Sequence, residues 1–242
     1  MTDKTVCVII PTYGNEGTIA DVVRRTNAEP IGEVIVVVDG NPAATLSSLH
    51  NSGEKCTIVS YEKNKGKGYA LRCGFDKARE LGYDYAITLD GDGQHYPEDI
   101  PLLLAAHAKE QDALIVGVRN LNAENMPTSN TKANKFSNFW FKLQTGVALS
   151  DTQSGYRLYP LRKISNKWIK TFRYESELEL LVFASWNGIE IREQAVRVYY
   201  PPEGERVSHF RPFADFMRIT ALNTVLTTIA VFRFLLGKRR KR

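Results

Sequence analysis

Unbroken apolar runs in the first half of the chain narrow its possible folds more than any other feature. Val6–Ile10 and Val34–Val38 contain only valine, isoleucine and cysteine. A strand with one face in water alternates polar and apolar residues, whereas a continuous apolar run is typical of a strand buried on both faces. Stretches with helical spacing separate these runs, and that alternation is the pattern of α/β proteins. The sequence therefore predicts a doubly wound, mostly parallel sheet covered by helices.

The same signals place the other elements. In the first half we expect strands and helices in turn, at Val6–Ile10, Glu16–Ala28, Val34–Val38, Thr57–Tyr61, Tyr69–Leu81, Tyr85–Leu89, Ile100–Lys109 and Ala113–Val118. In the less regular second half we expect a polar, asparagine-rich loop at 119–135, helices at Phe136–Leu149 and Glu175–Trp186, and one or two strands within Ile189–Tyr199. Residues 1–212 are expected to form one domain.

Polar loops follow four of the expected strands. They are Pro11–Glu16, Asp39–Asn41, Lys63–Gly68 and Asp90–His95. In a doubly wound sheet, ligands bind beyond the carboxyl ends of the strands. We therefore expect these four loops to meet at one edge of the sheet and to form the functional site there.

Two aspartates two positions apart follow the strand that ends at Leu89. Side chains at positions i and i+2 of an extended segment point the same way, so Asp90 and Asp92 can face one ion together. Two carboxylates suit Mg²⁺ or Mn²⁺, which takes its remaining ligands from water and substrate phosphates. The structural alternative is an Asp-Gly turn that merely ends a strand.

The basic excess of the chain lies in its last five residues. The sequence has 32 Lys and Arg against 27 Asp and Glu, and without Lys238–Arg242 the basic residues also number 27. The body therefore lacks the basic character of a nucleic-acid-binding domain. Cys7, Cys56 and Cys73 show no metal-binding spacing, and the N-terminus shows no signal peptide. A reduced, cytosolic compartment is expected.

A long apolar stretch at helical spacing, Phe213–Leu236, precedes the basic tail. Its most apolar part, Ile219–Leu236, has 18 residues and includes Asn223 and Arg233, whereas a spanning helix needs about 20 mainly apolar residues. We therefore expect 213–242 to form an amphipathic helix on the bilayer surface, with its tail near anionic headgroups. The alternative is a helix packed on the domain and a solvated basic tail.

Segments spread over most of the chain resemble glycosyltransferase family 2, whose members have the GT-A (Rossmann-like) fold. The segments that carry this resemblance are Val8–Glu16 (VIIPTYGNE), Val36–Gly40 (VVVDG), Asn64–Leu71 (NKGKGYAL) and Leu89–Gln94 (LDGDGQ). Within the family, the chain is most similar to polyprenyl-phosphate sugar transferases of the dolichol-phosphate-mannose type. That likeness rests on Asp90–Gln94, Gly117–Arg119, Asp151–Arg157 and Gly204–His209. The last segment departs from the family pattern, because His209 stands where a lysine is usual.

The resemblance implies a nucleotide-sugar pocket at the sheet edge. The residues that would line it are Pro11, Tyr13, Glu16, Asp39, Lys65, Gly66 and Lys67. Asp39 would accept hydrogen bonds from the base or ribose, and the lysines beside a helix start would contact the diphosphate. Structural roles stay open as well: a turn or cap for Asp39, a first-turn carboxylate for Glu16, and a solvated basic loop for the lysines.

The resemblance also implies roles in catalysis. Asp90, Asp92 and Gln94 would hold the metal ion, which clamps the donor diphosphate. The candidate phosphate-binding residues are Arg119, Arg157, Arg206 and His209, with Ser154 near the acceptor. Arginine suits phosphate because its guanidinium donates paired hydrogen bonds. Any of the four could instead be a surface residue. Asp90, Asp92, Arg119 and Arg157 are the residues to which we assign catalytic roles.

Together these features predict a metal-dependent, inverting transferase. It would move a hexose from a nucleotide diphosphate sugar to a polyprenyl-phosphate-like lipid at the cytoplasmic face of the membrane. A lipid phosphate is already anionic, whereas a sugar hydroxyl needs a general base. The alternative is the same fold acting on a saccharide or lipid hydroxyl, with Glu175 or Glu177 as base.

Two further classes are ranked lower. An oxidoreductase of the dinucleotide-binding Rossmann type is disfavoured, because Val6–Gly14 lacks the G-x-G-x-x-G loop. A non-enzymatic protein that binds nucleotide sugars or acts as a membrane scaffold is disfavoured by the intact Asp90 and Asp92.

Overall fold

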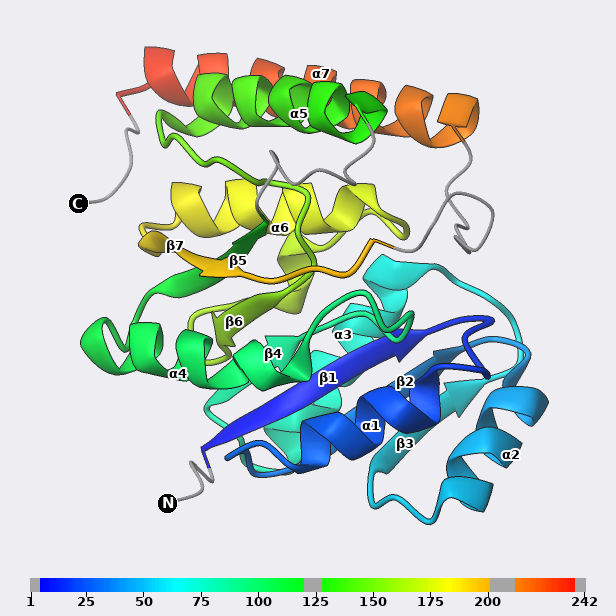
Figure 1. Ribbon diagram of the computed structural model, residues 1–242. Coiled ribbons are helices and arrows are strands. Elements are labelled where there is room, and N and C mark those ends of the chain that lie inside the picture. The colour runs from blue at the N-terminus through cyan, green and yellow to red at the C-terminus, as the bar shows by residue number, and fades with distance from the viewer. Residues whose placement is uncertain (1–4, 120–127, 201–211, 238–242) are drawn as a thin grey trace.

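The computed structural model describes residues 5–119, 128–200 and 212–237, and its centre is a seven-stranded sheet with helices on both faces (Figure 1). The elements, in chain order, are β1 (Val6–Thr12), α1 (Ile19–Asn27), β2 (Val34–Asp39), α2 (Pro42–Ser52), β3 (Thr57–Tyr61), α3 (Lys67–Glu80), β4 (Tyr85–Thr88), α4 (Ile100–Lys109), β5 (Leu114–Arg119), α5 (Thr128–Thr145), β6 (Arg157–Pro160), α6 (Glu175–Trp186), β7 (Ile191–Val196) and α7 (Pro212–Leu235).

The strands lie in the order β3-β2-β1-β4-β6-β5-β7. Only β6 runs antiparallel to its neighbours, β4 and β5, and the other pairs are parallel. From β1 the sheet is extended to one side by β2 and β3 and to the other side from β4 onward. The loops after β1 and β4 therefore lead to opposite sides of the sheet, and ligands of such sheets bind at this topological switch point. The prediction of a doubly wound, mostly parallel sheet is confirmed.

The burial of the strands explains their apolar runs. Every residue of β1 and β2 is buried, whereas the edge strand β3 alternates between exposed and half-buried residues. On one face the core packs Leu71 and Phe75 of α3 with Leu180 of α6. On the other face it packs α1 and α4. Continuous hydrophobic cover on both faces is what the valine and isoleucine runs require.

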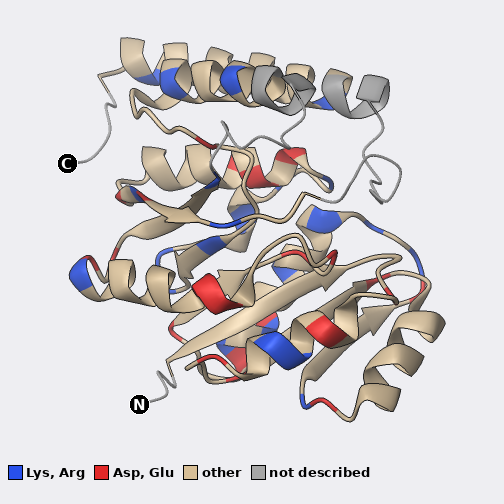
Figure 2. Ribbon diagram, in the orientation of Figure 1, with Lys and Arg blue, Asp and Glu red and all other residues tan. Residues whose placement is uncertain are grey.

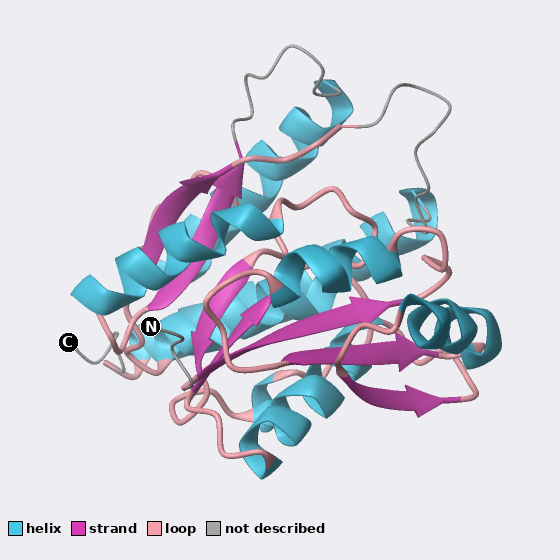
Figure 3. Ribbon diagram, turned by 60° about the horizontal axis from the view of Figure 1, so that its bottom comes forward, coloured by secondary structure: helices cyan, strands magenta, loops and turns pink. Residues whose placement is uncertain are grey.

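Helices α5 and α7 form a further layer outside α6, farthest from the sheet centre (Figures 1 and 3). Phe141 of α5 and Leu226 of α7 join the core beneath them. The expected loop at 119–135 is wrong over its second half, because α5 begins at Thr128. The polar composition of that half predicts a loop, but Asn134 lies in a helix and donates a hydrogen bond inward to Asp151. Helix α2 was not anticipated.

Candidate active site

The loops after β1, β2, β3 and β4 meet around a pocket of about 790 Å³. Pro11 lines it from the end of β1 and Tyr13 from the loop that follows. Asp39 lines it as the last residue of β2, and Gly66 lines it from the loop after β3. Asp90, Asp92 and Gln94 line it from the fourth. The expected meeting of the four loops at one sheet edge is therefore what the structure contains.

Asp39 organises the loop that follows β3. Its two carboxylate oxygens accept hydrogen bonds from the backbone N–H of Lys65 at 2.7 Å and of Gly66 at 2.8 Å. Gly66 has a φ of 90°, and a Cβ at this position would lie 2.3 Å from the carbonyl oxygen of Phe172. Only glycine allows the loop to pass this close to another backbone segment. The carboxylate thus presents a fixed loop, with Lys67 at its end, to the pocket.

Lys67 lies between two carboxylates. Its Nζ is 2.6 Å from Oδ1 of Asp90 and 3.0 Å from Oε2 of Glu177 on α6. Gly155 closes the cluster, because a Cβ there would lie 2.8 Å from Nζ and 3.0 Å from both Asp90 Oδ2 and Glu177 Oε1. Three charged groups therefore share a space that a side chain at position 155 would fill.

The pKa values of this cluster follow from its charges. Burial disfavours the charged form of Asp90, but the Lys67 ammonium outweighs burial and holds the pKa of Asp90 below its ordinary value. Burial, and then the charge on Asp90, raise the pKa of Asp92 to about 6. Burial lowers the pKa of His95 to about 4, so its neutral Nδ1 accepts a hydrogen bond from the Asp90 N–H at 3.2 Å.

The chemistry of this edge fits a divalent cation whose shell is completed by a substrate. Among the described residues, no three acidic, histidine or cysteine side chains converge on one point. Asp90 and Asp92 supply two carboxylates. Burial, and then the charge on Asp90, raise the pKa of Asp92, and a bound cation would lower that pKa again. One or two carboxylates completed by phosphate oxygens and water is the usual protein site for Mg²⁺.

Arg119 faces the pocket from the end of β5, and Asp151 fixes its direction. The guanidinium donates to Asp151 from Nε at 2.6 Å and from a terminal nitrogen at 2.8 Å, and the Arg119 N–H adds a third bond. Asp151 is fully buried. Because these paired bonds use one edge of the guanidinium, its other edge faces the pocket. Asp151 lies in a segment that the sequence singled out, but it was not itself assigned a role.

Arg157 lies in the interior and does not line the pocket. It donates hydrogen bonds to the carbonyl oxygens of Ser154, Thr152 and Glu177 and to the hydroxyl of Tyr159. These bonds tie the 152–157 segment to α6. In this arrangement its guanidinium supports the wall of the site and has no contact with the space where a phosphate would bind. Ser154 is likewise buried.

The remaining candidates differ in their positions. Glu16 is exposed and does not line the pocket. Lys65 does not line it either; its Nζ donates to the Tyr69 hydroxyl and lies 4.3 Å from the centre of that ring. Arg206 and His209 lie outside the described residues. Sequence reasoning missed Arg173 and Tyr174, which line the pocket just before α6. The available signal was an arginine just before the helix start that carries Glu175 and Glu177.

Comparisons with known proteins agree with this fold. Residues 7–164 match the family described as "Glycosyl transferase family 2". The chain is 31% identical over 220 residues to the UDP-N-acetylglucosamine–dolichyl-phosphate N-acetylglucosaminyltransferase of Methanococcus voltae, covering 83% of this chain and 88% of that relative. It is 31% identical over 185 residues to the undecaprenyl-phosphate mannosyltransferase of Micrococcus luteus, covering 72% and 75%.

Solved structures share the fold at low sequence identity. Glucosyl-3-phosphoglycerate synthase from Mycobacterium tuberculosis, in complex with Mn²⁺, UDP and glucosyl-3-phosphoglycerate, superposes with a TM-score of 0.63 at 17% identity, covering 94% of this chain and 80% of that one. The same synthase in complex with Mg²⁺ and UDP gives a TM-score of 0.59 at 18% identity, covering 94% and 79%.

Proposed function

The chain belongs to glycosyltransferase family 2, and on that premise we propose that it transfers a hexose from a nucleotide diphosphate sugar to a polyprenyl-phosphate lipid at the membrane surface. The observation that carries this proposal is the arrangement of charge in the pocket. Asp90 and Asp92 mark a cation site, while Lys67, Arg119 and Arg173 place positive charge around it. Both substrates of the proposed reaction are phosphate anions, which such a pocket attracts.

The relatives named above support the acceptor class. Their names place the sugar on dolichyl phosphate and on undecaprenyl phosphate, respectively. A phosphate nucleophile also agrees with the state of Glu177, the acidic side chain that α6 contributes to the pocket lining. Its carboxylate is held in an ion pair with Lys67, whereas a general base must be able to accept a proton from the substrate.

The proposed chemistry is one displacement at the anomeric carbon. An oxygen of the lipid phosphate bonds to that carbon as the bond to the donor diphosphate breaks, and the nucleoside diphosphate leaves with the electron pair. Configuration inverts, and no proton needs to move, because the attacking phosphate is already an anion. A bound Mg²⁺ or Mn²⁺, held by Asp90, Asp92 and Gln94, would neutralise charge on the leaving diphosphate.

The residues of the chain position the two phosphate groups. Arg119, held by Asp151, is assigned to the acceptor phosphate. Lys67 and Arg173 are assigned to the donor diphosphate, and Lys67 would then exchange part of its contact with Asp90 for contact with substrate. Asp39 and Gly66 hold the loop that would face the nucleotide. Such prealigned charges stabilise the transition state without reorganising water.

Helix α7 supports a position at the bilayer surface. Among the described residues one helix is long and apolar enough to cross a membrane, over Met217–Leu235, and 17% of that stretch is buried. Its polar members nevertheless have partners in the domain. Asn223 is buried and accepts a hydrogen bond from Gln144 at 3.0 Å, and Arg233 donates to the carbonyl oxygen of Trp186 at 3.0 Å. We therefore propose that α7 lies on the membrane rather than across it.

A hydroxyl acceptor is the second candidate, because Glu177 does line the pocket and its Oε1 has no hydrogen-bond partner among the described residues. The two acceptors are separated by one experiment. A labelled donor sugar is offered with polyprenyl phosphate and with the corresponding polyprenol, and the lipid products are identified by mass spectrometry. A sugar phosphate lipid formed only from the phosphate supports the proposal. A glycoside formed from the alcohol, and lost in Glu177→Gln, supports the second candidate.

A further inference from the structure

We propose that α5 and α7 together form one bilayer-contact surface, so that α5 contacts the membrane as well as α7. This proposal extends the proposed function, which needs the pocket to reach a lipid acceptor. The outer surface is defined by large apolar side chains that both helices expose, namely Phe136, Phe139, Leu143, Val225, Phe232 and Leu235.

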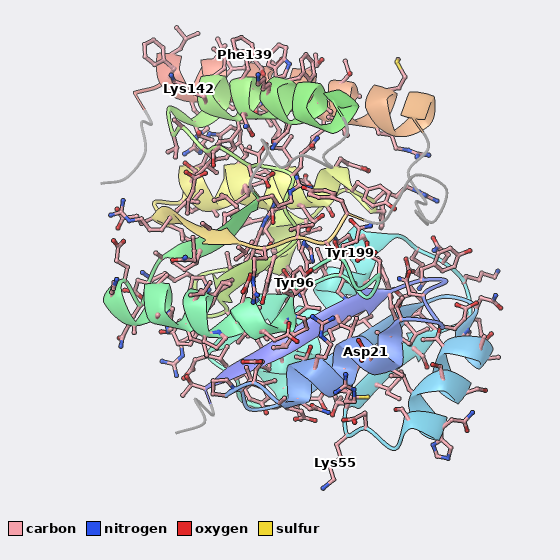
Figure 4. All side chains as sticks on the ribbon, viewed as in Figure 1. Asp21, Lys55, Tyr96, Phe139, Lys142 and Tyr199 are labelled. Carbon is pink, nitrogen blue, oxygen red and sulfur yellow. The ribbon has the colours of Figure 1, made fainter. Side chains whose placement is uncertain are left out.

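These side chains are strongly exposed. Phe139 and Leu143 of α5 are 60% and 56% exposed, and Phe232 and Leu235 of α7 are 60% and 71% exposed. The two helices lie side by side in the outermost layer, and Phe139 projects away from the sheet (Figures 1 and 4). Several large, strongly exposed apolar side chains on two adjacent helices mark a surface that another apolar phase covers.

The inward face of α5 is more polar than that of an ordinary surface helix. It buries Asn134 and Ser137 as well as Phe141, while the outward face carries Phe139 and Leu143. A helix that packs on a core and faces water usually buries mainly apolar residues and exposes polar ones. Burying polar groups inward costs free energy unless they are hydrogen-bonded, and here both are bonded to the 151–152 segment. An apolar environment outside α5 explains why its sequence is arranged in this way.

The charges around the outer surface select a lipid bilayer over a protein as the occupant. Helix α5 contains three lysines and no acidic residue, and Lys135 and Lys142 are exposed. Figure 2 shows lysine and arginine but no acidic residue on the coloured parts of α5 and α7. Long basic side chains beside an apolar stripe can keep their apolar stems in the interface and reach anionic headgroups with their charges.

Helix α5 also connects the outer surface to the pocket. Asn134 donates a hydrogen bond to Asp151 at 3.1 Å, and Asp151 holds Arg119. Asn138 accepts from the Thr152 N–H at 3.0 Å and donates to the Ser150 carbonyl oxygen at 2.7 Å. The face that would contact lipid and the arginine assigned to the lipid phosphate therefore belong to one hydrogen-bonded unit, which fixes the pocket relative to the membrane surface.

The test is vesicle flotation of the full chain, without substrates, on phosphatidylcholine vesicles with and without phosphatidylglycerol. The variant is the double substitution Phe139→Ser and Leu143→Ser. The matched control is Leu102→Ser with Ile58→Ser, which alters two apolar side chains, 43% and 42% exposed, on α4 and β3. We expect the α5 variant to bind vesicles at least on the order of tenfold more weakly. The control should bind as the unaltered chain does, and thermal melting checks that both variants fold.

Two results would overturn the proposal. One is unchanged vesicle binding by the folded α5 variant. The other is light scattering that shows a dimer for the unaltered chain and a monomer for the α5 variant. That result would assign the surface to a second copy of the chain. Transfer to a short-chain, water-soluble polyprenyl phosphate is measured in parallel. If that transfer persists while vesicle binding does not change, the surface proposal fails and the proposed function stands. If the α5 variant loses vesicle binding, but neither the unaltered chain nor either variant transfers sugar, the proposed function fails and the surface proposal stands.

Discussion

The Nζ atom of Lys67 lies 2.6 Å from Oδ1 of Asp90, so the carboxylate assigned to the metal ion is already paired with a cation of the protein. Glu177 binds the other side of the same ammonium. Burial lowers the pKa of Lys67, but the two carboxylates outweigh burial and raise it above its ordinary value. The lysine therefore compensates two acidic groups that would otherwise repel each other across the pocket.

Replacing Lys67 with methionine is expected to destabilise the metal-free protein by about 3 kcal/mol, because Asp90 and Glu177 then lie near each other without a cation. Mn²⁺ should restore part of that loss by supplying positive charge. Thermal unfolding with and without MnCl₂ measures both effects. Lys65→Met is the control, since Lys65 contacts tyrosines and not these carboxylates. Equal melting of the two variants without metal would contradict the expectation.

Metal affinity should fall as the pH drops through the pKa of Asp92, which is raised to about 6. The protonated form dominates below that pH, and a cation must then displace a proton to bind. From pH 6 downward the affinity is expected to decrease by roughly tenfold per pH unit. Isothermal titration with Mn²⁺ at pH 7 and pH 5 measures the change. Asp92→Asn should weaken binding at pH 7 and remove most of the pH dependence, and equal affinity of the unaltered chain at both values would refute this.

Asp151→Asn is expected to lower kcat/KM for the lipid phosphate by roughly 10- to 100-fold, because Arg119 loses its paired carboxylate. Binding of the nucleotide donor should change little, since Asp151 does not line the pocket. Steady-state kinetics with the lipid varied, and titration with the nucleotide, separate these effects. Glu193→Gln is the control, because Glu193 bonds the neighbouring Ser150 without reaching Arg119. Equal losses in both variants would mean that the loop matters and the arginine does not.

His95 should contribute stability that disappears in acid. Its folded-state pKa is lowered to about 4 from an ordinary value of 6.5, so the unfolded chain binds the proton first. The contribution is complete above pH 6.5 and is lost as the pH falls toward 4, amounting to roughly 2 kcal/mol by pH 4.5. Urea unfolding of the unaltered chain and His95→Gln at pH 7 and pH 4.5 tests this. The cost of the substitution should shrink at pH 4.5, and a constant cost would contradict the assignment.

The sheet and the placement of Asp90 and Asp92 together at the pocket could be predicted from the sequence, because each rests on local patterns. The Val6–Ile10 run specifies a strand buried on both faces, and the spacing of Asp90 and Asp92 specifies a shared direction. The parallel order then brings their loops together. None of this requires knowledge of contacts between distant residues.

What could not be predicted depends on such contacts. Arg157 has the residue type of a phosphate ligand, but its partners include the carbonyl oxygen of Glu177, 20 positions away. Asn134 lies in a stretch of loop-like composition, but it faces inward from a helix and donates a hydrogen bond to Asp151, 17 positions away. Helix α2 buries only Thr45 and Leu49, so its apolar pattern is too weak to recognise.

The most direct test of the proposed function is the release of nucleoside diphosphate from a panel of nucleotide sugars, with Mn²⁺ or Mg²⁺ and with or without polyprenyl phosphate. The unaltered chain and Asp92→Ala are compared. We predict that one donor is consumed, that its turnover requires both the metal and the lipid phosphate, and that Asp92→Ala loses it. A rate of nucleoside diphosphate release that does not depend on the lipid phosphate but increases with a sugar or lipid alcohol would contradict the proposed acceptor. Folded protein that neither releases nor binds any nucleotide would contradict the transferase itself.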